Sequence, residues 1–306
     1  MSIQVAFIFP GQGCQYVGIG HSLYQDFTLA KSIFLEAEEI LGLPLRKYCF
    51  EGPFEELTKT KIVQPAILTV EYIIFSLLQE EGFEPTWVAG HSLGEYAALI
   101  ASGAITYANA LSLVRKRAEH MAAVSVNGGM AAILNLPLTD LAGMVEDLQV
   151  EGIIELANFN SPVQTVVSGE KELVTKLTAR IKQSGRGKVI PLEVQGAFHS
   201  SMMKPAAEKF REDLKRTSFL PIKTPIISNV TAEEVLSSDQ LPLLLEKQIY
   251  SPVRWEETIK KLASLDCDLF LELGGKILSG MVKKTFSKAN TYFIRETEDL
   301  KKYLQN

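Results

Sequence analysis

A serine between two glycines is the strongest candidate for a reactive group in this sequence. The stretch GHSLG, at residues 90–94, follows an apolar run that predicts a strand over 86–89 and precedes a run that predicts a helix from Glu95 to about 103. The pattern G-x-S-x-G between a strand and a helix is typical of a nucleophile elbow, a sharp turn that exposes the serine oxygen above a sheet. We therefore interpret Ser92 as a nucleophile, and the alternative is an ordinary strand-to-helix turn.

The letters GHSL occur a second time, at residues 20–23. Here Tyr24 replaces the second glycine and no apolar strand precedes the turn. We interpret Ser22 as a residue at the start of a helix, not as a second reactive site.

A serine nucleophile needs a base, and the chain has four histidines. His199, in GAFHS, follows a strand predicted over 188–194, which is a usual place for a catalytic group. His91 should point away from its neighbour in the turn, His120 is expected on a solvated helix face, and His21 has no evident orienting partner. No acidic residue in a recognisable motif follows the order Ser, Asp/Glu, His, so we expect a Ser–His dyad oriented by a neutral group. A structural role remains the alternative for His199.

One arginine is predicted on an apolar helix face. In the helix that Thr106 should cap, Arg117 has Leu113, Val114 and Met121 as its neighbours one turn away. A guanidinium stays charged and is costly to bury without an anion. Arg117 therefore either forms an internal ion pair with Asp or Glu, or clamps a substrate carboxylate with its planar fork.

The elements that must position these residues alternate between strands and helices. We predict a strand over 3–9, helices over 31–41 and 66–80, and a helix from 106 to about 123. From 130 to 194 the order becomes strand, helix, strand, strand, helix, strand. The α/β alternation then resumes with a strand predicted over 225–229. We predict an α/β-hydrolase-like parallel-sheet domain (1–127 and 196–306) with an inserted ferredoxin-like βαββαβ subdomain at 128–195.

Composition excludes several classes of protein. Of 306 residues, 31 are Lys or Arg and 36 are Asp or Glu, so a net charge of −5 argues against nucleic-acid and anionic-membrane binding. Three distant cysteines argue for a reduced protein without disulfides, and neither a signal peptide nor a spanning segment is predicted. The four histidines lack zinc-site spacing. We expect a cytoplasmic monomer without metal or other cofactor.

A glycine-rich loop follows the first predicted strand. FPGQGCQ, at 9–15, fails the dinucleotide-binding spacing because Tyr16 stands where the third glycine is required. Such a loop can instead bring a backbone N–H close to a substrate, as an oxyanion-hole donor.

These residues resemble the malonyl-CoA:acyl carrier protein transacylases of fatty acid and polyketide synthesis, over nearly the whole chain. The resemblance rests on ordered motifs: FPGQGCQ, QPAI at 64–67, GHSLGEYAAL, Arg117 with Met121, NFNSP at 158–162, GAFHS, SNVTA at 228–232 and QIYSPVRW at 248–255. It implies transfer of a malonyl group from malonyl-CoA to the phosphopantetheine thiol of an acyl carrier protein through a malonyl-serine intermediate.

The resemblance also implies roles for residues. Ser92 is the expected nucleophile and His199 the base, which the backbone carbonyl of Gln248 would support. Gln12 and Leu93 would supply the oxyanion-hole amides. The malonyl carboxylate would be held by Arg117. Three further residues are expected to line the substrate pocket: Met121, Asn160 and Gln64. A structural role is the alternative for Asn160 and for Gln64.

Two positions depart from the family pattern. Cys14 stands where the family usually has serine, which would place a thiol near the site. GAFHS is more like the acyltransferases of polyketide synthases than the housekeeping enzymes, which often have serine before the histidine. Phe198 would fill space beside the acyl α-carbon and favour malonyl over methylmalonyl. As a discrete chain with this motif, the protein resembles an acyltransferase that acts in trans for a polyketide synthase. An acyl hydrolase of the same fold is the main alternative, although it would have shed Arg117. A carboxylesterase and a non-enzymatic carrier-docking protein are less well supported, since the triad acid is missing while Ser92 and His199 are both present.

Carrier proteins of this kind are generally acidic, so docking would use local basic clusters. Two such clusters occur in the sequence: Arg180, Lys182, Arg186 and Lys188, and Lys283, Lys284 and Lys288. An ordinary solvated surface is the alternative for each of them.

Overall fold

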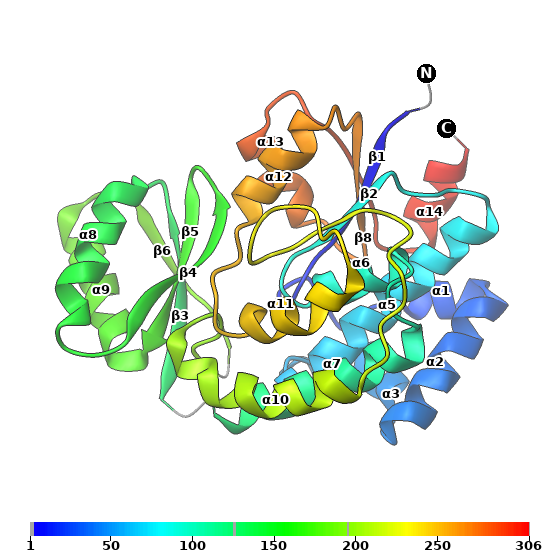
Figure 1. The fold of residues 1–306 in the computed structure, drawn as a ribbon, viewed down its shortest axis with the longest axis horizontal. Helices are drawn as coiled ribbons and strands as arrows, with labels where there is room; N and C mark the ends of the chain where they lie inside the picture. Colours follow the sequence, from blue (N-terminus) through cyan, green and yellow to red (C-terminus); the bar gives the residue numbers. More distant parts are fainter. Residues whose placement is uncertain (1–2, 125–126, 195, 306) are drawn as a thin grey trace.

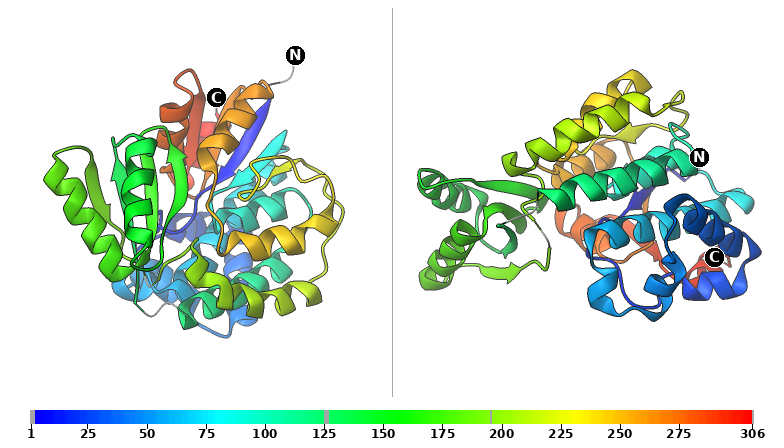
Figure 2. Two further views of the ribbon diagram at one scale, coloured as in Figure 1. Left: turned by 60° about the vertical axis from the view of Figure 1, so that its left-hand side comes forward. Right: turned by 90° about the horizontal axis from the view of Figure 1, so that it is seen from below.

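Two β-sheets stand side by side in a computed structural model of the protein, which describes residues 3–124, 127–194 and 196–305 (Figure 1). One sheet is parallel and lies among most of the helices, and the other is antiparallel and carries two helices of its own. The second sheet and its helices form a lobe at one end of the molecule, as the turned views also show (Figure 2). The mixed α/β class predicted from the sequence is confirmed.

The parallel sheet has five strands in the order β7-β2-β1-β8-β9. Its strands are β1 (Val5–Phe9), β2 (Trp87–Gly90), β7 (Ile226–Ile227), β8 (Leu269–Leu273) and β9 (Asn290–Ile294). The central strand β1 is VAFIF, and four of its five residues are buried, because helices cover both faces of a parallel sheet.

Helices surround this sheet and supply most of the core. In chain order they are α1 (His21–Asp26), α2 (Thr28–Leu41), α3 (Leu45–Glu51), α4 (Phe54–Leu57), α5 (Thr60–Glu80), α6 (Gly94–Ala101), α7 (Tyr107–Ala123), α10 (Lys204–Arg216), α11 (Leu241–Gln248), α12 (Trp255–Ser264), α13 (Leu278–Thr285) and α14 (Thr297–Leu304). As predicted, Thr106 caps α7, since its hydroxyl accepts a hydrogen bond from the backbone N–H of Asn109.

The antiparallel-sheet unit, as we name the second sheet with its two helices, has the element order predicted from the sequence. Its elements are β3 (Gly128–Leu134), α8 (Leu138–Gln149), β4 (Ile154–Ser161), β5 (Gln164–Glu170), α9 (Lys171–Ser184) and β6 (Lys188–Pro191), with strand order β4-β5-β3-β6. Gln195, where the predicted insertion ends, lies outside the described residues.

Side chains along the strands of this sheet point alternately to its two faces, and both faces are buried. Ile133 and Val167 pack under α8 and α9, whereas Ala132 and Val166 face the rest of the molecule. Because successive strand residues point to opposite faces, one sheet can hold its own helices and also offer an apolar wall to the neighbouring unit.

Two predicted strands are shorter than expected. β6 ends at Pro191, which lacks the N–H needed to continue a ladder, although Leu192 N–H still donates to the Met130 carbonyl at 3.0 Å. β7 has two residues because the chain turns back after them, with Ser228 N–H donating to the Glu233 carbonyl at 3.0 Å. Both strands lie at sheet edges, where pairing constrains length least.

Among the described residues, α5 is the one helix long and apolar enough to cross a membrane by length and composition. However, 78% of its most apolar window is buried inside the protein, against the parallel sheet and its neighbouring helices. This burial is what a core helix of a globular protein shows.

Candidate active site

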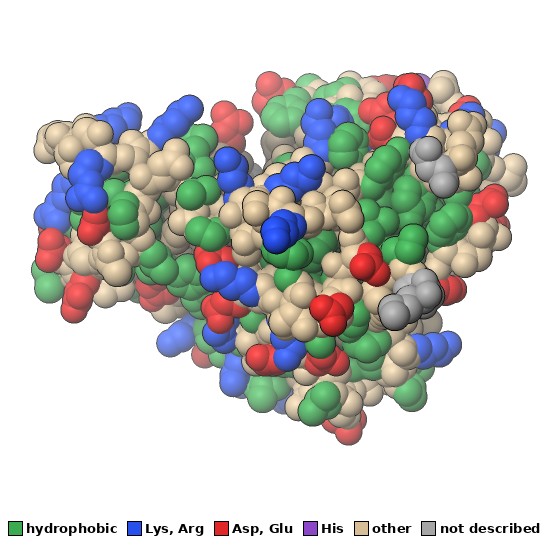
Figure 3. Space-filling model, turned by 90° about the horizontal axis from the view of Figure 1, so that it is seen from above, with side chains coloured by type: hydrophobic (Ala, Val, Ile, Leu, Met, Phe, Trp, Pro, Cys, Tyr) green, Lys and Arg blue, Asp and Glu red, His purple; other side chains and the backbone are tan. Residues whose placement is uncertain are grey.

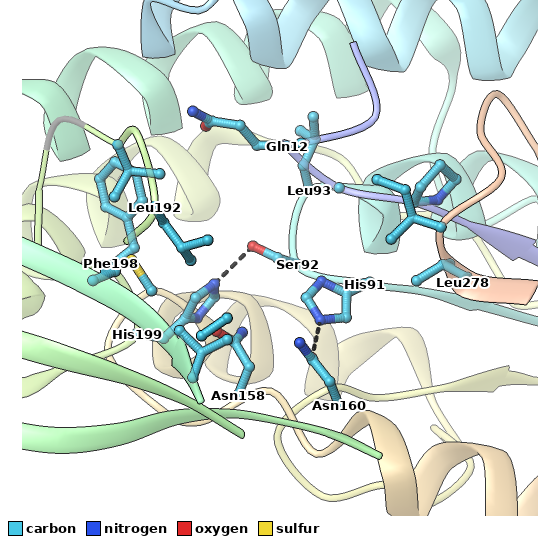
Figure 4. Close-up of a pocket in the computed structure, with 18 of the residues that line it drawn as sticks. Gln12, His91, Ser92, Leu93, Asn158, Asn160, Leu192, Phe198, His199 and Leu278 are labelled. Carbon is cyan, nitrogen blue, oxygen red and sulfur yellow. Dashed lines mark hydrogen bonds between the residues drawn. The ribbon is translucent and has the colours of Figure 1, made fainter. Parts of the chain in front are cut away.

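A pocket of about 530 Å³ lies between the two sheets and contains the residues predicted to react. The end of β1, the β2–α6 turn and α7 contribute Gln12, Ser92, Leu93 and Arg117, and the antiparallel-sheet unit contributes a mostly apolar side. Figure 4 shows Ser92 near the centre, with Gln12 and Leu93 on one side of it and His199 on the other. A pocket at the carboxyl ends of parallel strands is a usual place for a ligand.

The turn that carries Ser92 has the geometry of a nucleophile elbow. Ser92 has φ 54°, in the left-handed region, and connects β2 directly to α6. A Cβ on Gly90 would lie 2.0 Å from the backbone of Gly94, and a Cβ on Gly94 would lie 2.0 Å from the Phe9 carbonyl oxygen. Both glycines are therefore required by the close approach of backbone to backbone, which explains the G-x-S-x-G spacing.

His199 is the histidine that contacts the serine. Its Nε2 lies 2.7 Å from Ser92 Oγ, while its Nδ1 lies 2.9 Å from the Gln248 carbonyl oxygen and 3.2 Å from that of Ser251. Since carbonyl oxygens only accept, Nδ1 carries the proton and Nε2 is free to accept the serine proton. The neutral orienting group expected in place of a triad acid is present as two backbone carbonyls.

Burial keeps this imidazole neutral. The pKa of His199 is lowered to about 3, first by burial and then by the positive charge of Arg117. His199 also has φ 59°, a conformation that its backbone hydrogen bond to the Ile249 carbonyl at 3.2 Å helps to hold. The imidazole of His199 is therefore unprotonated and fixed in place at physiological pH.

Arg117 is buried in the pocket wall, where it donates to amide and hydroxyl oxygens. It is 1% exposed and donates to Gln64 Oε1 at 2.7 Å, Gln248 Oε1 at 3.0 Å and Ser92 Oγ at 3.2 Å. Within the described part of the chain no Asp or Glu lies within ion-pair distance of it, and its Nε has no hydrogen-bond partner. Of the two sequence interpretations, the internal ion pair is wrong. The cation faces the pocket, where an anion can reach it.

The glycine-rich loop packs directly against the elbow. A Cβ on Gly11 would lie 2.5 Å from the His91 carbonyl oxygen, so a larger residue would push the loop away. This close contact places Gln12 beside Ser92 at the pocket wall, next to Leu93. Figure 4 thus shows the two residues expected to supply oxyanion-hole amides on the same side of Ser92.

The other predicted pocket residues are also brought together. Gln64, Met121, Asn160 and Phe198 all line the pocket. Asn160 Oδ1 lies 2.8 Å from His91 Nε2, so His91 points away from Ser92, as expected (Figure 4).

Two residues with important contacts were missed from the sequence. Asn229 accepts the Ser92 N–H with its Oδ1 at 2.7 Å, and it donates from Nδ2 to the Gly90 carbonyl at 2.5 Å. Glu95, 3% exposed, accepts from the Asn229 N–H at 3.0 Å and from Gln248 Nε2 at 2.7 Å. For Glu95, the sequence offered one signal, an acidic residue in the first turn of the helix after the elbow. Exposed acidic residues are also common at that position, so the signal does not indicate burial.

The structure adds detail to two expectations about other side chains. His120 is not simply solvated, because its Nε2 lies 2.7 Å from Asp213 Oδ2 of α10. Cys14 is buried outside the pocket lining, where burial and the nearby carboxylates of Glu71 and Glu272 raise the pKa of its thiol well above the usual range. In residues 3–124, 127–194 and 196–305, no three His, Cys, Asp or Glu side chains gather as a metal site.

The fold and the site together define a class of protein. A Ser–His pair at a nucleophile elbow, beside a buried arginine, is suited to acyl transfer through an acyl-serine. The family described as acyl transferase domain matches residues 6–292 of this chain.

Individual relatives narrow the class. The chain is 42% identical to the malonyl CoA-acyl carrier protein transacylase of Bacillus subtilis (strain 168), over 99% of this chain and 96% of that protein. It is 37% identical to a polyketide biosynthesis malonyl CoA-acyl carrier protein transacylase of the same organism, over 92% of this chain and 96% of that protein. A malonyl-transacylase solved in complex with a holo type II polyketide-synthase acyl-carrier protein matches with TM-score 0.95, 34% identity and 99% coverage of both chains. The chain belongs to the malonyl CoA-acyl carrier protein transacylase family.

Proposed function

We propose that this acyltransferase moves a malonyl group from malonyl-CoA to the phosphopantetheine thiol of an acyl carrier protein, through a malonyl ester of Ser92. The main supporting observation is the short distance between Ser92 Oγ and His199 Nε2, 2.7 Å, beside Arg117, which has no Asp or Glu of the described residues within ion-pair distance. Family membership supports the same activity.

The first half-reaction follows from the hydrogen bonds. His199 Nε2 accepts the Ser92 Oγ proton as Oγ attacks the thioester carbon. The amides of Gln12 and Leu93 stabilise the resulting oxyanion, and loss of one such donor typically costs about 10²–10³ in rate. The C–S bond then breaks, and the coenzyme A thiolate takes the proton from the imidazolium.

The second half-reaction runs the same steps with a different thiol. The phosphopantetheine thiol gives its proton to His199 Nε2 and attacks the malonyl ester carbon. The C–O bond breaks, and Ser92 Oγ recovers the proton. Arg117 pairs with the free malonyl carboxylate in both halves, which fixes the acyl group relative to the nucleophile. This assignment needs no metal or other cofactor.

Phe198 supports a finer assignment. It is 6% exposed and lines the pocket next to the base. We infer that it restricts space beside the acyl α-carbon and favours malonyl over methylmalonyl. Because of Phe198, we propose that the protein is a trans-acting acyltransferase of a polyketide synthase. Fatty acid synthesis is the alternative pathway.

The pocket mouth suggests where a carrier protein docks. α13 contributes Leu278 and Met281 to the pocket and carries Lys283 and Lys284 in its last turn. In the sequence-predicted cluster at 180–188, by contrast, Arg186 is paired with Asp140. Figure 3 shows acidic and basic side chains interspersed on one face, so a local cluster rather than a broad field must guide an acidic partner. We favour the α13 lysines as that cluster.

We also propose boundaries for two subdomains. We assign a discontinuous catalytic subdomain to 1–127 and 196–306 and an inserted subdomain to 128–195. The parallel order β7-β2-β1-β8-β9 with the elbow after β2 supports an α/β-hydrolase-like description. The βαββαβ order and the antiparallel order β4-β5-β3-β6 support a ferredoxin-like one. A monomeric, cytoplasmic state stays a prediction.

Intact-mass spectrometry after incubation with malonyl-, methylmalonyl- or acetyl-CoA tests the proposed function. We expect a malonyl adduct that disappears when a holo acyl carrier protein is added, with the malonyl mass moving to the carrier. Release of free malonate instead of transfer would identify an acyl hydrolase. Absence of any adduct with malonyl-CoA would contradict the proposal.

A further inference from the structure

A buried carboxylate lies directly behind the nucleophile. Glu95 is in the first turn of α6, three residues after Ser92, and is 3% exposed. Its Oε1 accepts the Asn229 N–H at 3.0 Å and its Oε2 accepts from Gln248 Nε2 at 2.7 Å. Both oxygens are therefore used as acceptors, and no Lys, Arg or His among the described residues lies within ion-pair distance of them.

Glu95 is one of three groups that fix which way the side-chain amide of Gln248 points. Gln248 Nε2 donates to Glu95 Oε2 and to the Ser92 carbonyl, both at 2.7 Å, and Gln248 Oε1 accepts from Arg117 Nη2 at 3.0 Å. A carboxylate can only accept, so the NH₂ group must face Glu95 and the amide oxygen must face Arg117. With the amide reversed, an NH₂ group would meet the guanidinium.

The contact with Asn229 holds the elbow. Asn229 bridges the turn, because its side chain accepts from the Ser92 N–H and donates to the Gly90 carbonyl. These bonds fix a serine whose φ of 54° is unfavourable for a residue with a side chain. Glu95 thus contacts both Asn229, which holds the turn at Ser92, and Gln248, which accepts from Arg117.

We propose that Glu95 is a positioning residue for acyl transfer: by fixing the amide of Gln248 it aims the Arg117 guanidinium at the malonyl carboxylate. This inference rests on the proposed function, since it gives Arg117 the malonyl carboxylate as its ligand. Glu95 itself touches neither the serine oxygen nor the substrate pocket.

The surroundings of Glu95 keep its carboxyl group mostly ionised only above about pH 7. Burial raises its pKa to about 7, and hydrogen bonds from Asn229 and Gln248, together with the charge of Arg117, oppose this rise. Assays at about pH 8 keep the group largely ionised, one pKa unit being a factor of ten in the protonation equilibrium.

Two substitutions at this position separate orientation from charge. Glu95→Gln keeps the size but offers only one acceptor oxygen to the Asn229 N–H and the Gln248 NH₂, so the Gln248 amide is held less firmly, by the Ser92 carbonyl and Arg117. Glu95→Asp keeps the charge but draws the carboxylate back by one methylene. Glu246→Gln is the matched control, because Glu246 is a buried carboxylate of the same helix as Gln248 and pairs with Arg211 outside the site.

The test measures acylation of Ser92 by malonyl-CoA and acetyl-CoA, as the ratio of the two kcat/KM values. We expect Glu95→Gln and Glu95→Asp each to lower the malonyl/acetyl ratio roughly tenfold, the scale of coupling within one hydrogen-bond network. In an Arg117→Ala background neither substitution should lower the ratio further. Glu246→Gln should leave the ratio unchanged, even if it lowers Tm.

Three outcomes would overturn the inference. Equal losses with both substrates, additive with Arg117→Ala, would make Glu95 a structural residue only. A raised ratio would make it a counter-charge that competes with malonyl. A wild-type ratio in the Glu95→Asp enzyme would show that charge without position suffices. Failure of the wild-type enzyme to accept malonyl would instead contradict the proposed function and leave the ratio undefined.

Discussion

The two walls of the pocket differ in what they contribute. The wall from the parallel sheet and its helices carries Ser92, His199 and Arg117, all polar and joined by hydrogen bonds. The opposite wall, from the antiparallel-sheet unit, is mostly apolar, with residues such as Val166 and Leu192. In our proposal one wall holds the reacting groups in place, and the other shapes the space for the acyl group and limits the access of water.

This difference has a physical basis in the two sheets. Parallel strands end at one edge, where turns and helix starts gather polar groups around a substrate. In the antiparallel sheet, residues alternate between two faces, so the face toward the pocket repeats an apolar pattern. A reactive acyl-serine benefits from both, because water must be excluded while a thiol is admitted.

The largest effect is expected at the nucleophile. Ser92→Ala should abolish covalent acylation by malonyl-CoA because only one oxygen, the attacking one, is lost. Intact-mass spectrometry measures the adduct. Ser22→Ala, which changes the serine of the other GHSL stretch, is the matched control and should acylate normally. A malonyl adduct that persists on the Ser92→Ala protein would place the acyl group elsewhere.

The next effect concerns the base and its pKa. Since the pKa of His199 is lowered to about 3, the wild-type kcat/KM should show no acid limb from this group near its ordinary value of about 6.5. Arg117→Ala removes a positive charge that lowers this pKa, so an acid limb should move upward in pH. The dependence of kcat/KM on pH is measured with acetyl-CoA for both enzymes. Identical pH profiles would contradict the electrostatic effect of Arg117 on His199.

Because the pKa of His199 differs between the folded and unfolded states, this histidine also makes the free energy of unfolding depend on pH. Its folded-state pKa lies below its unfolded value, so the unfolded chain binds a proton first as the pH falls from about 6.5 toward 3. The contribution of His199 to the free energy of unfolding is therefore lost progressively on acidification. Denaturant titrations at several pH values should show a weaker acid dependence for His199→Ala.

A smaller, partial effect is expected at the selectivity residue. Phe198→Ser should open room beside the α-carbon and raise the methylmalonyl/malonyl ratio of kcat/KM. A methyl group in a pocket is worth about 1–3 kcal/mol, so a shift and not an inversion is expected. An unchanged ratio would remove Phe198 as the selectivity residue and weaken the polyketide assignment.

The smallest effect should come from the apolar wall. Leu192→Asn places a polar group where the antiparallel-sheet unit lines the pocket, so water should compete better with the thiol. We expect a few-fold rise in malonate release relative to transfer, with acylation of Ser92 little changed. If acylation fell as much as transfer did, the division of roles between the walls would be wrong.

Much of the site could be predicted from local sequence. The sequence pattern of the elbow lies within five residues, 90–94, so its glycines and the periodicity of the flanking segments can be recognised from the sequence alone. Arg117 was found because three apolar neighbours on one helix face make a charge conspicuous. The βαββαβ order could likewise be read from alternating periods.

The supporting network could not be predicted in the same way. Glu95 meets Asn229 and Gln248 across 134 and 153 residues of chain, and no local pattern encodes such contacts. The resemblance pointed to the Gln248 carbonyl, but not to its side chain, which meets Arg117 and the elbow. Strand ends were missed at β6 and β7 because Pro191 and a tight turn after Ile227 override apolar periodicity.

The acylation of Arg117→Ala by malonyl-CoA and acetyl-CoA tests the central claim most directly. Malonyl would lose the partner of its carboxylate, which should cost about 2–5 kcal/mol in kcat/KM. Acetyl has no carboxylate, so its acylation should fall little, or rise. Equal losses with both substrates, accompanied by a lower Tm, would show that Arg117 is a structural residue and would contradict the proposed carboxylate clamp.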